Sequence, residues 1–332
     1  MTSSQGKQAV KKAALGASGL LCSSVGLGTW AMGGWMWGGT DDTAAIASIH
    51  AALDAGVNFI DTAPAYGLGH AESVVGLALR GRRHEAVVST KCGLIWHTEK
   101  GTHFFDEEGR KVYRYLGRDS IAHEVEQSLR RLHTDCIDLY FTHWQDATTP
   151  VAETMGALLD LKVQGKIRAI GVSNVDASTL AEYLRHGPVD AVQERYSLLD
   201  RGIETGLMPL CRAHGVSIHG YGSLAMGALA GPIDAARAFT GDDQRRDNPR
   251  FSAAGQARLV AFFKAIEPLR EAHDCTFGQL LVAWALSKVD VALCGARNPA
   301  QAIENAGAGA IELNPGELQH IAAAADQHLD TL

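Results

Sequence analysis

Short apolar segments rich in β-branched residues recur along the 332-residue chain, and stretches with helical periodicity separate them. This alternation predicts parallel strands, because a parallel pair needs a crossover connection that a helix usually provides. Most of the segments show no polar alternation, which is typical of strands buried on both faces. The segments predicted to be strands are residues 25–28, 57–60, 86–90, 137–142, 167–172, 189–192, 216–219 and 291–293.

Eight strand–helix units in about 300 residues fit a closed (β/α)8 barrel of the TIM type better than an open sheet. No linker rich in Pro, Gly or Ser interrupts the series, so residues 1–332 are expected to form one α/β domain. A short N-terminal β-hairpin is expected before the barrel, with residues 1–12 loosely held. Two long connectors, residues 93–118 and 225–251, are expected to be extended loops on the rim that carries barrel active sites.

The composition narrows the class of protein further. Apolar residues make up 46% of the chain and charged residues 20%, so a large core can form and disorder is excluded. The net charge is −7 without runs of Lys or Arg, and nucleic acid is not an expected partner. Neither a signal segment nor a stretch of about 18 apolar residues occurs, so a soluble, cytoplasmic protein without membrane contact is expected. The six cysteines lack CxxC spacing, and no metal site is predicted.

Four polar side chains stand near the ends of consecutive predicted strands. Asp61, Lys91 and His143 follow the second, third and fourth strands, and Tyr66 lies five residues beyond Asp61. Because the carboxyl ends of barrel strands meet at one mouth, these side chains are expected to lie together. An ammonium group beside a phenol is expected to lower the phenol pKa, and an imidazole can donate to a carbonyl oxygen. The set suits delivery of a proton to an oxygen that gains negative charge.

Each of these residues also has an ordinary structural explanation when taken alone. An Asp at a strand end can cap a turn, a Lys there is commonly solvated, and a His is commonly a core residue with its hydrogen bonds satisfied. Residues 220–225 fit the G-x-G-x-x-A dinucleotide pattern, but no clear helix follows them. They are therefore predicted to form a barrel loop.

Seven segments resemble, in order, those of the aldo-keto reductase family. They are GLGTW (26–30), NFIDTAPAYGLGHAESVVG (58–76), STKCG (89–93), RRLHTDCIDLYFTHW (130–144), GKIRAIGVSN (165–174), VQERYSLLD (192–200) and CGARNPAQAIEN (294–305). The resemblance covers nearly the whole chain, and within the family it is strongest to the bacterial general-stress and inositol-operon-type reductases. It implies a nicotinamide-dependent oxidoreductase with Asp61, Tyr66, Lys91 and His143 as its catalytic residues. Tyr66 is then the general acid.

The resemblance also implies residues that hold the cofactor. Those matching the carboxamide-binding positions are Ser173, Asn174 and Gln193, and the one matching the aromatic that stacks on the nicotinamide ring is Tyr196. The segment that resembles the pyrophosphate loop is Tyr221, Gly222, Ser223 and Leu224. The residues that match the pocket for the adenosine end are Arg297, Gln301 and Asn305.

The adenosine pocket also has an argument from its own residues. Asn298 can cap a helix and Pro299 suits the first helical position, so a helix N-terminus that attracts phosphate is expected there. Arg297 precedes it and can bind a 2′-phosphate, which favours NADPH over NADH as the cofactor. The sequence departs from the family at Cys294 and at Ser223, where proline is usual.

The expected function is NADPH-dependent reduction of aldehydes or ketones to alcohols, acting on a small-molecule carbonyl substrate. Aromatic residues that could wall the substrate pocket, or equally pack in the core, are Trp30, Trp35, Trp96 and Trp144. A sugar or secondary-alcohol dehydrogenase working in the oxidative direction is an alternative. A non-catalytic, nicotinamide-binding regulatory subunit on the same scaffold is another. A monomer is the default, because no interface stripe is evident.

Overall fold

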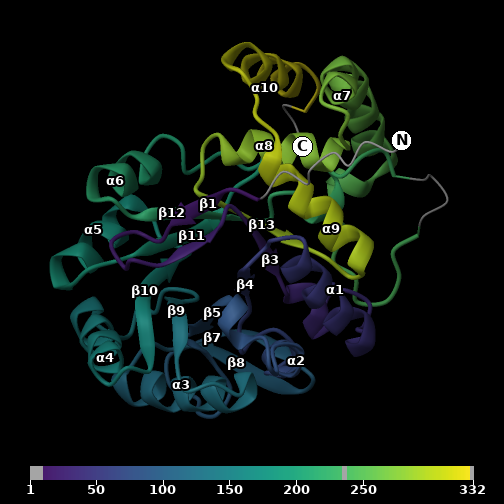
Figure 1. Cartoon of the computed structure of the whole chain (residues 1–332). Helices are drawn as coiled ribbons and strands as arrows, with labels where there is room; N and C mark the ends of the chain where they lie inside the picture. The colour runs from purple at the N-terminus through teal and green to yellow at the C-terminus, as the bar shows by residue number, and fades with distance from the viewer. Residues whose placement is uncertain (1–9, 234–237, 330–332) are drawn as a thin grey trace.

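The computed structural model describes residues 10–233 and 238–329, and in them eight parallel strands close into a barrel (Figure 1). The strands in ring order are β3 (Val25–Gly28), β4 (Phe59–Asp61), β5 (Val87–Cys92), β9 (Ile137–Thr142), β10 (Ile167–Ser173), β11 (Ala191–Arg195), β12 (Ser217–Tyr221) and β13 (Val291–Gly295). Every segment predicted to be a strand contributes to this ring. The prediction of a (β/α)8 barrel is confirmed.

Helices cover the outside of the barrel, where their apolar faces and the outward side chains of the strands form one large core. The α-helices are α1 (Asp42–Asp54), α2 (His70–Ala78), α3 (Arg118–Leu132), α4 (Val151–Val163), α5 (Ala177–His186), α6 (Leu207–His214), α7 (Ala253–Ala272), α8 (Phe277–Leu286), α9 (Pro299–Gly307) and α10 (Pro315–Leu329). Short 3-10 helices are η1 (Trp30–Gly33), η2 (Arg83–Glu85), η3 (Ala225–Gly227), η4 (Pro249–Phe251) and η5 (Ala308–Ala310). Within the described ranges, no helix is both long and apolar enough to span a membrane.

The barrel interior is a second apolar core, which an N-terminal hairpin closes. The predicted hairpin is confirmed: β1 (Lys12–Ala14) pairs antiparallel with β2 (Leu21–Ser23). Leu15, Leu20 and Cys22 of the hairpin pack in one buried cluster with inward side chains of the strands, such as Phe59 and Phe141. The amino end of the barrel is therefore filled, and the chemistry must lie at the carboxyl end.

Residues 1–12 were predicted to be loosely held. Of these, residues 1–9 lie outside the described part of the chain. Val10 is buried against the outer core and Lys12 begins β1, so the chain is already packed from residue 10 onward.

The rim segment 93–118 is an extended connection as predicted, and it contains a small antiparallel sheet that was not predicted. Its strands β6 (Leu94–Ile95), β8 (Arg110–Arg114) and β7 (Thr102–Glu107) pair antiparallel in that order. Apolar side chains of these strands pack with Trp96 and Trp144, which gives the segment a small core of its own; they are Leu94, Phe104, Phe105 and Val112. The other long connector, 225–251, contains only η3 and η4 among its described residues, and residues 234–237 lie outside them.

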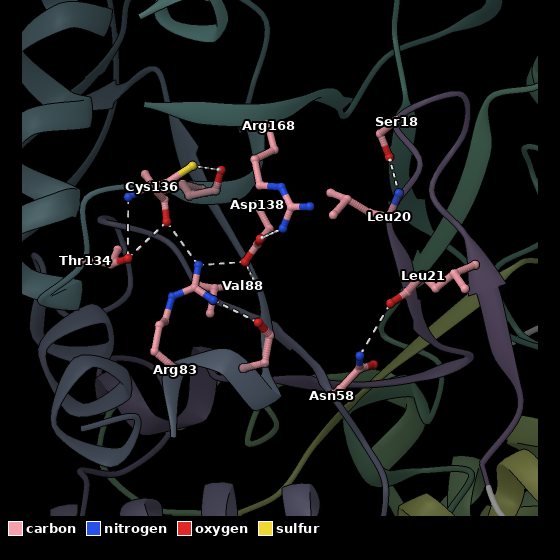
Figure 2. Close-up of polar contacts among 12 residues, drawn as sticks. Ser18, Leu20, Leu21, Asn58, Arg83, Val88, Thr134, Cys136, Asp138 and Arg168 are labelled. Carbon is pink, nitrogen blue, oxygen red and sulfur yellow. Dashed lines mark hydrogen bonds and ion pairs between the residues drawn. The ribbon is translucent and has the colours of Figure 1, made fainter. Parts of the chain in front are cut away.

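Four Asn or Asp side chains clamp alternate strand pairs at the amino end of the barrel. Three of them accept a backbone N–H of the neighbouring barrel strand: Asp138 Oδ2 from Val88 (2.9 Å), Asp190 Oδ2 from Ile170 (2.9 Å) and Asp290 Oδ2 from Ile218 (2.7 Å). Asn58 Oδ1 accepts from the N–H of Ser23 (2.6 Å), the last residue of β2, two residues before β3. Figure 2 shows the clamp formed by Asp138, whose carboxylate is also bound by Arg83 (2.6 Å) and Arg168 (2.9 Å). Backbone donors at this end are thus satisfied inside the protein.

Candidate active site

The four side chains predicted to converge do meet at the carboxyl end of the barrel. Asp61 ends β4, Lys91 lies on β5, His143 follows β9, and Tyr66 lies in the connection after β4. The ammonium group of Lys91 donates to Asp61 Oδ2 (2.7 Å), to the Thr62 carbonyl (2.8 Å) and to the Tyr66 hydroxyl oxygen (3.2 Å). All three ammonium protons are used, and one of them is aimed at the phenol.

The Asp61 carboxylate is held by three donors. Besides Lys91 on Oδ2, its Oδ1 accepts from Ser89 Oγ (2.7 Å) and from Gln193 Nε2 (2.9 Å). Asp61 is 3% exposed and Lys91 is wholly buried, so the ion pair is screened very little by water. The carboxylate therefore fixes where the ammonium group lies.

The pKa values of this cluster correct one expectation. Burial, and secondly the Asp61 carboxylate, raise the pKa of the Tyr66 phenol well above its usual value. Burial also lowers the pKa of Lys91, although Asp61 opposes that change. The predicted lowering of the Tyr66 pKa by Lys91 was wrong in this protein, because Asp61 neutralises the ammonium and burial disfavours a phenolate. Tyr66 consequently carries its proton at neutral pH, which is the state a proton donor requires.

His143 presents a neutral imidazole beside the phenol. Its ring meets the Tyr66 ring edge-on at 5.8 Å between centroids, and Asn174 Nδ2 donates to its backbone carbonyl (2.7 Å). Burial, followed by the nearby Lys91 charge, lowers the pKa of His143 well below its usual value. Its Nδ1 has no hydrogen-bond partner among the described residues. A neutral imidazole keeps one N–H, which can donate to an oxygen lying between it and Tyr66.

Polar groups beside this cluster come from the next strands. Ser173 ends β10 and donates to the Gln193 carbonyl (2.6 Å), and Asn174 follows it with a left-handed φ of 55°. Asn tolerates this conformation better than most residues, and such strain is concentrated at functional sites. The Tyr221 hydroxyl donates to Asn174 Oδ1 (2.8 Å). Ser173, Asn174, Gln193 and Tyr221 thus form one connected surface at the mouth.

Tyr196, predicted to stack on a nicotinamide ring, lies outside the barrel. Side chains alternate along β11, so Gln193 faces inward to Asp61 and Tyr196, three residues later, faces outward. The Tyr196 ring is wholly buried and stacks on Trp284, and its hydroxyl donates to Glu204 (2.7 Å). It cannot reach a ligand at the mouth without the core opening. Tyr221 is the half-buried aromatic residue that faces the mouth.

The predicted pyrophosphate segment turns from β12 into η3. Gly222 adopts a φ of 70°, where a side chain would be strained. Ser223, which replaces the usual proline, is buried and donates to the Gly220 carbonyl (3.1 Å), and Leu224 is the N-cap residue of η3. The serine hydroxyl thus closes this turn with a hydrogen bond, in a position where proline would restrict φ.

Helix α9 begins as predicted beyond β13, with Asn298 as its N-cap and Pro299 at its first position. Gln301 Oε1 accepts from the Arg297 backbone N–H (2.8 Å), and Asn305 Nδ2 donates to the Gly295 carbonyl (3.1 Å). These two side chains therefore secure the turn that carries Arg297.

The Arg297 guanidinium is exposed and contacts the loop between η1 and α1. It donates to the carbonyls of Trp37 and Gly39, both at 3.2 Å. The same loop meets the segment after β12, because Met36 N–H donates to Asp242 (2.8 Å) and the Arg245 guanidinium lies 5.1 Å from the Trp37 ring centroid. Both hydrogen-bond acceptors of Arg297 are therefore neutral carbonyl groups. A phosphate group is a stronger partner for a guanidinium than a neutral carbonyl group is.

Aromatic side chains surround Tyr66. Trp30 stacks on the Tyr66 ring at 6.2 Å, and Trp35 stacks on Phe105 of β7 at 4.8 Å. Trp96 and Trp144 belong with Phe104 and Phe105 to a small apolar cluster at the rim. The four predicted tryptophans are all half-buried; Trp30 lies beside Tyr66, and the other three pack with residues of the rim sheet.

A model of the Aldo/keto reductase family matches residues 24–326. The chain belongs to the aldo-keto reductase family. This aldo-keto reductase is 40% identical over 316 residues to the NADH-specific methylglyoxal reductase of Escherichia coli K12, covering 93% of the chain and 96% of that relative. The family and this relative make the chain an NAD(P)H-dependent oxidoreductase.

Two examples show how closely solved structures resemble this reductase. A glycerol dehydrogenase from Gluconobacter oxydans superposes with a TM-score of 0.87 at 36% identity, covering 99% of this chain and 98% of that one. An aldo-keto reductase from Klebsiella pneumoniae in complex with NADPH has a TM-score of 0.73 at 29% identity, covering 96% and 95%.

Ser89, which binds Asp61, is a residue of this site that the sequence analysis did not single out. A signal was present, since Ser89 lies two residues before Lys91 on the same strand face and occupies the register position opposite Asp61. Aromatic residues of the rim segments also contribute: Trp37 contacts Arg297 and Arg245, and Phe104 and Phe105 line the rim. Their contacts depend on how the loops fold together.

Proposed function

We propose that this aldo-keto reductase reduces aldehydes and ketones to alcohols with NADPH, using Tyr66 as the general acid. The observation that carries the proposal is the contact between the Lys91 ammonium and the Tyr66 hydroxyl (3.2 Å) in a buried cluster. A bound nicotinamide supplies the hydride that adds to the carbonyl carbon. The chain supplies the proton that completes the alcohol.

Each residue has a distinct part in that proton transfer. Tyr66 gives its hydroxyl proton to the substrate oxygen as negative charge develops there, and Lys91 stabilises the phenolate that remains. Asp61 keeps Lys91 charged and in place. The His143 N–H donates to the same substrate oxygen and orients it toward Tyr66.

The residues at the mouth fit a dinucleotide. Ser173, Asn174 and Gln193 offer hydroxyl and amide groups for the carboxamide, and the half-buried Tyr221 ring offers a stacking surface in place of Tyr196. Gly222, Ser223 and Leu224 are placed to carry the pyrophosphate. We infer that Arg297, with Gln301 and Asn305 holding its turn, binds a 2′-phosphate and favours NADPH. The relative from Klebsiella pneumoniae was solved with NADPH, whereas the one from Escherichia coli is named NADH-specific.

A fluorescence titration of the wild type and of Arg297→Met with NADPH and with NADH tests the cofactor. Loss of a charge-assisted phosphate contact costs about 1.5–3 kcal/mol, so the NADPH Kd should rise at least tenfold in the variant. The NADH Kd should stay within a factor of about two. A wild type that binds NADH as tightly as NADPH would refute the assigned preference.

The chemistry is tested with Tyr66→Phe, which keeps the ring stacked on Trp30 and removes only the hydroxyl. The carbonyl-reduction kcat should fall by about 10²- to 10⁴-fold, as is typical for loss of a general acid. The NADPH Kd should stay near the wild-type value. Retained turnover in this variant would remove Tyr66 from the mechanism.

Alcohol oxidation is a second candidate, because the structurally similar Gluconobacter oxydans protein is named a glycerol dehydrogenase. The same residues run the reaction backward, with the Tyr66 phenolate accepting the alcohol proton. The Trp30 ring beside Tyr66 and the aromatic residues at the rim favour apolar or aromatic carbonyl substrates over polyols. Initial rates with aromatic aldehydes plus NADPH, and with glycerol plus NADP⁺, decide between the two directions.

A further inference from the structure

Ser89 occupies a position that the barrel builds directly beneath the reacting groups. On β5 the side chains of Val87, Ser89 and Lys91 face inward, since they alternate with outward residues. In the register of β4 and β5, Ser89 pairs with Asp61. Ser89 is wholly buried, and its hydroxyl donates to Asp61 Oδ1 at 2.7 Å. A buried hydroxyl among apolar strand residues is retained only where it has such a partner.

We propose that Ser89 is a positioning residue of the reaction, which orients the Asp61 carboxylate so that its Oδ2 faces Lys91. The proposal rests on the proposed function, because Asp61 acts through Lys91 on Tyr66. Ser89 contacts neither substrate nor cofactor. Its effect reaches the phenol through two consecutive hydrogen bonds, from Asp61 to Lys91 (2.7 Å) and from Lys91 to Tyr66 (3.2 Å).

Gln193, the other donor to Asp61 Oδ1, has two roles in the proposed site. Gln193 Nε2 donates to this oxygen at 2.9 Å, while the same amide is the group proposed to bind the cofactor carboxamide. When Gln193 adjusts to the carboxamide, Ser89 is the donor that keeps Oδ1 fixed. Ser89 can do so because it comes from the adjacent barrel strand, whose register with β4 holds its Cα in place.

Removing the Ser89 hydroxyl has a definite electrostatic consequence. A carboxylate that loses a donor holds more charge on its other oxygen, so Asp61 Oδ2 draws the Lys91 ammonium more strongly. Lys91 then stabilises the Tyr66 phenolate less. The alkaline limb of the kcat–pH profile for carbonyl reduction should move to higher pH, and kcat at pH 7 should fall about five- to tenfold. KM and the NADPH Kd should not change, because Ser89 does not contact either ligand.

The experiment compares Ser89→Ala and Ser89→Cys with Ser217→Ala as a matched control. Cysteine is close to serine in size but is a weak donor, so it tests the hydrogen bond with the smallest change in packing. Ser217 lies two residues before His219, whose ring contacts Phe59 inside the barrel, so Ser217 faces inward as well. Its hydroxyl contacts His219 Nε2 (3.2 Å) instead of Asp61. Each variant is assayed for kcat and KM from pH 6 to the highest pH at which the wild type stays folded, for NADPH Kd by fluorescence, and for stability by urea unfolding.

Both Ser89 variants should lose kcat and shift the alkaline limb, with the Ser217 variant unchanged in both. Ser89→Thr, which retains the hydroxyl, should keep the wild-type pH profile. Wild-type kcat and pH profile in Ser89→Cys would overturn the proposal while leaving the proposed function intact. A shift of equal size in Ser217→Ala would also overturn it, because any loss of a barrel hydroxyl would then suffice. A wild type that reduces no carbonyl compound would instead refute the proposed function, and the role of Ser89 with it.

Discussion

Replacing Asp61 with Asn breaks the buried ion pair with Lys91 while preserving the shape of the side chain. Asp61 Oδ2 and Lys91 Nζ are 2.7 Å apart, and the two side chains are 4% and 1% exposed. At that distance the Coulomb attraction is about 6 kcal/mol for an effective dielectric constant of about 20. Desolvation offsets most of this in the wild type. The variant loses the attraction but keeps the desolvation cost of the lysine.

The magnitude follows from how Lys91 can respond. If it stays charged, the uncompensated ion costs about 3–5 kcal/mol. If it loses its proton, the cost is about 1.4 kcal/mol for each pH unit between the working pH and its unfolded pKa of about 10.4. This amounts to about 4.6 kcal/mol at pH 7 and about 1.9 kcal/mol at pH 9. Both routes predict that Asp61→Asn loses at least 3 kcal/mol of unfolding free energy at pH 7, about the lower bound for breaking a buried pair.

The pH dependence has a definite sign. Burial already lowers the pKa of Lys91, and loss of Asp61 lowers it further. Between this folded-state pKa and about 10.4 the unfolded chain binds one more proton, so the stability of the variant rises with pH. Urea unfolding of the wild type, Asp61→Asn and Asp61→Asn/Lys91→Met at pH 7 and 9 measures the effect. The double variant has no buried ammonium, so it should be more stable than Asp61→Asn at pH 7 and lack the added pH dependence.

Two results would refute this reasoning. One is an Asp61→Asn protein within about 1 kcal/mol of the wild type at pH 7, since a broken buried pair should cost several times that. The other is a destabilisation that is the same at pH 7 and pH 9. Either result would mean that Lys91 finds another neutralising partner, and that Asp61 does not hold the ammonium in place.

Asp138→Ala should lower the unfolding free energy by about 2–4 kcal/mol in urea titrations, because it orphans the Val88 N–H and separates two arginines from their carboxylate. Its kcat should stay at the wild-type value, since this clamp lies at the opposite end of the barrel. Burial raises the pKa of Glu107 to about 7, so the folded state holds its proton more tightly and wild-type stability is lost as pH rises from about 4.5 to about 7. Glu107→Gln should remove that part of the pH dependence of unfolding. Tyr221→Ala should weaken NADPH binding in a fluorescence titration, whereas Tyr196→Phe should leave it unchanged and reduce stability alone.

The strand ends illustrate what could be predicted from sequence. Asp61, Lys91 and His143 each follow an apolar run, and a closed parallel barrel brings such positions to one mouth wherever the intervening helices lie. Predicting that these three groups converge therefore needed only the strand count and the strand ends. The same holds for helix α9, whose Asn298 cap and Pro299 act within one turn of the chain.

Residues that depend on a facing partner were harder to predict. Tyr196 and Tyr221 both lie at strand ends, but only the register of β11 with β12 shows which faces the mouth: Tyr221 pairs with the inward-facing Arg195, and Tyr196 is the next, outward-facing residue. The rim segment 93–118 pairs with itself through polar, exposed strands whose apolar partners come from other loops. The local sequence pattern does not indicate which strands of this segment pair or which loops they contact.

The sequence by itself determined the barrel, its hairpin and the four groups at its mouth, because periodicity and strand-end chemistry are local properties that the closed sheet turns into geometry. Only the tertiary structure decided the protonation of that site. Burial, together with Asp61, keeps the Tyr66 proton in place and weakens the hold of Lys91 on its own proton, reversing the expectation drawn from two neighbouring groups in isolation. Such shifts depend on how much water the whole fold excludes, and no single segment of the chain encodes that quantity.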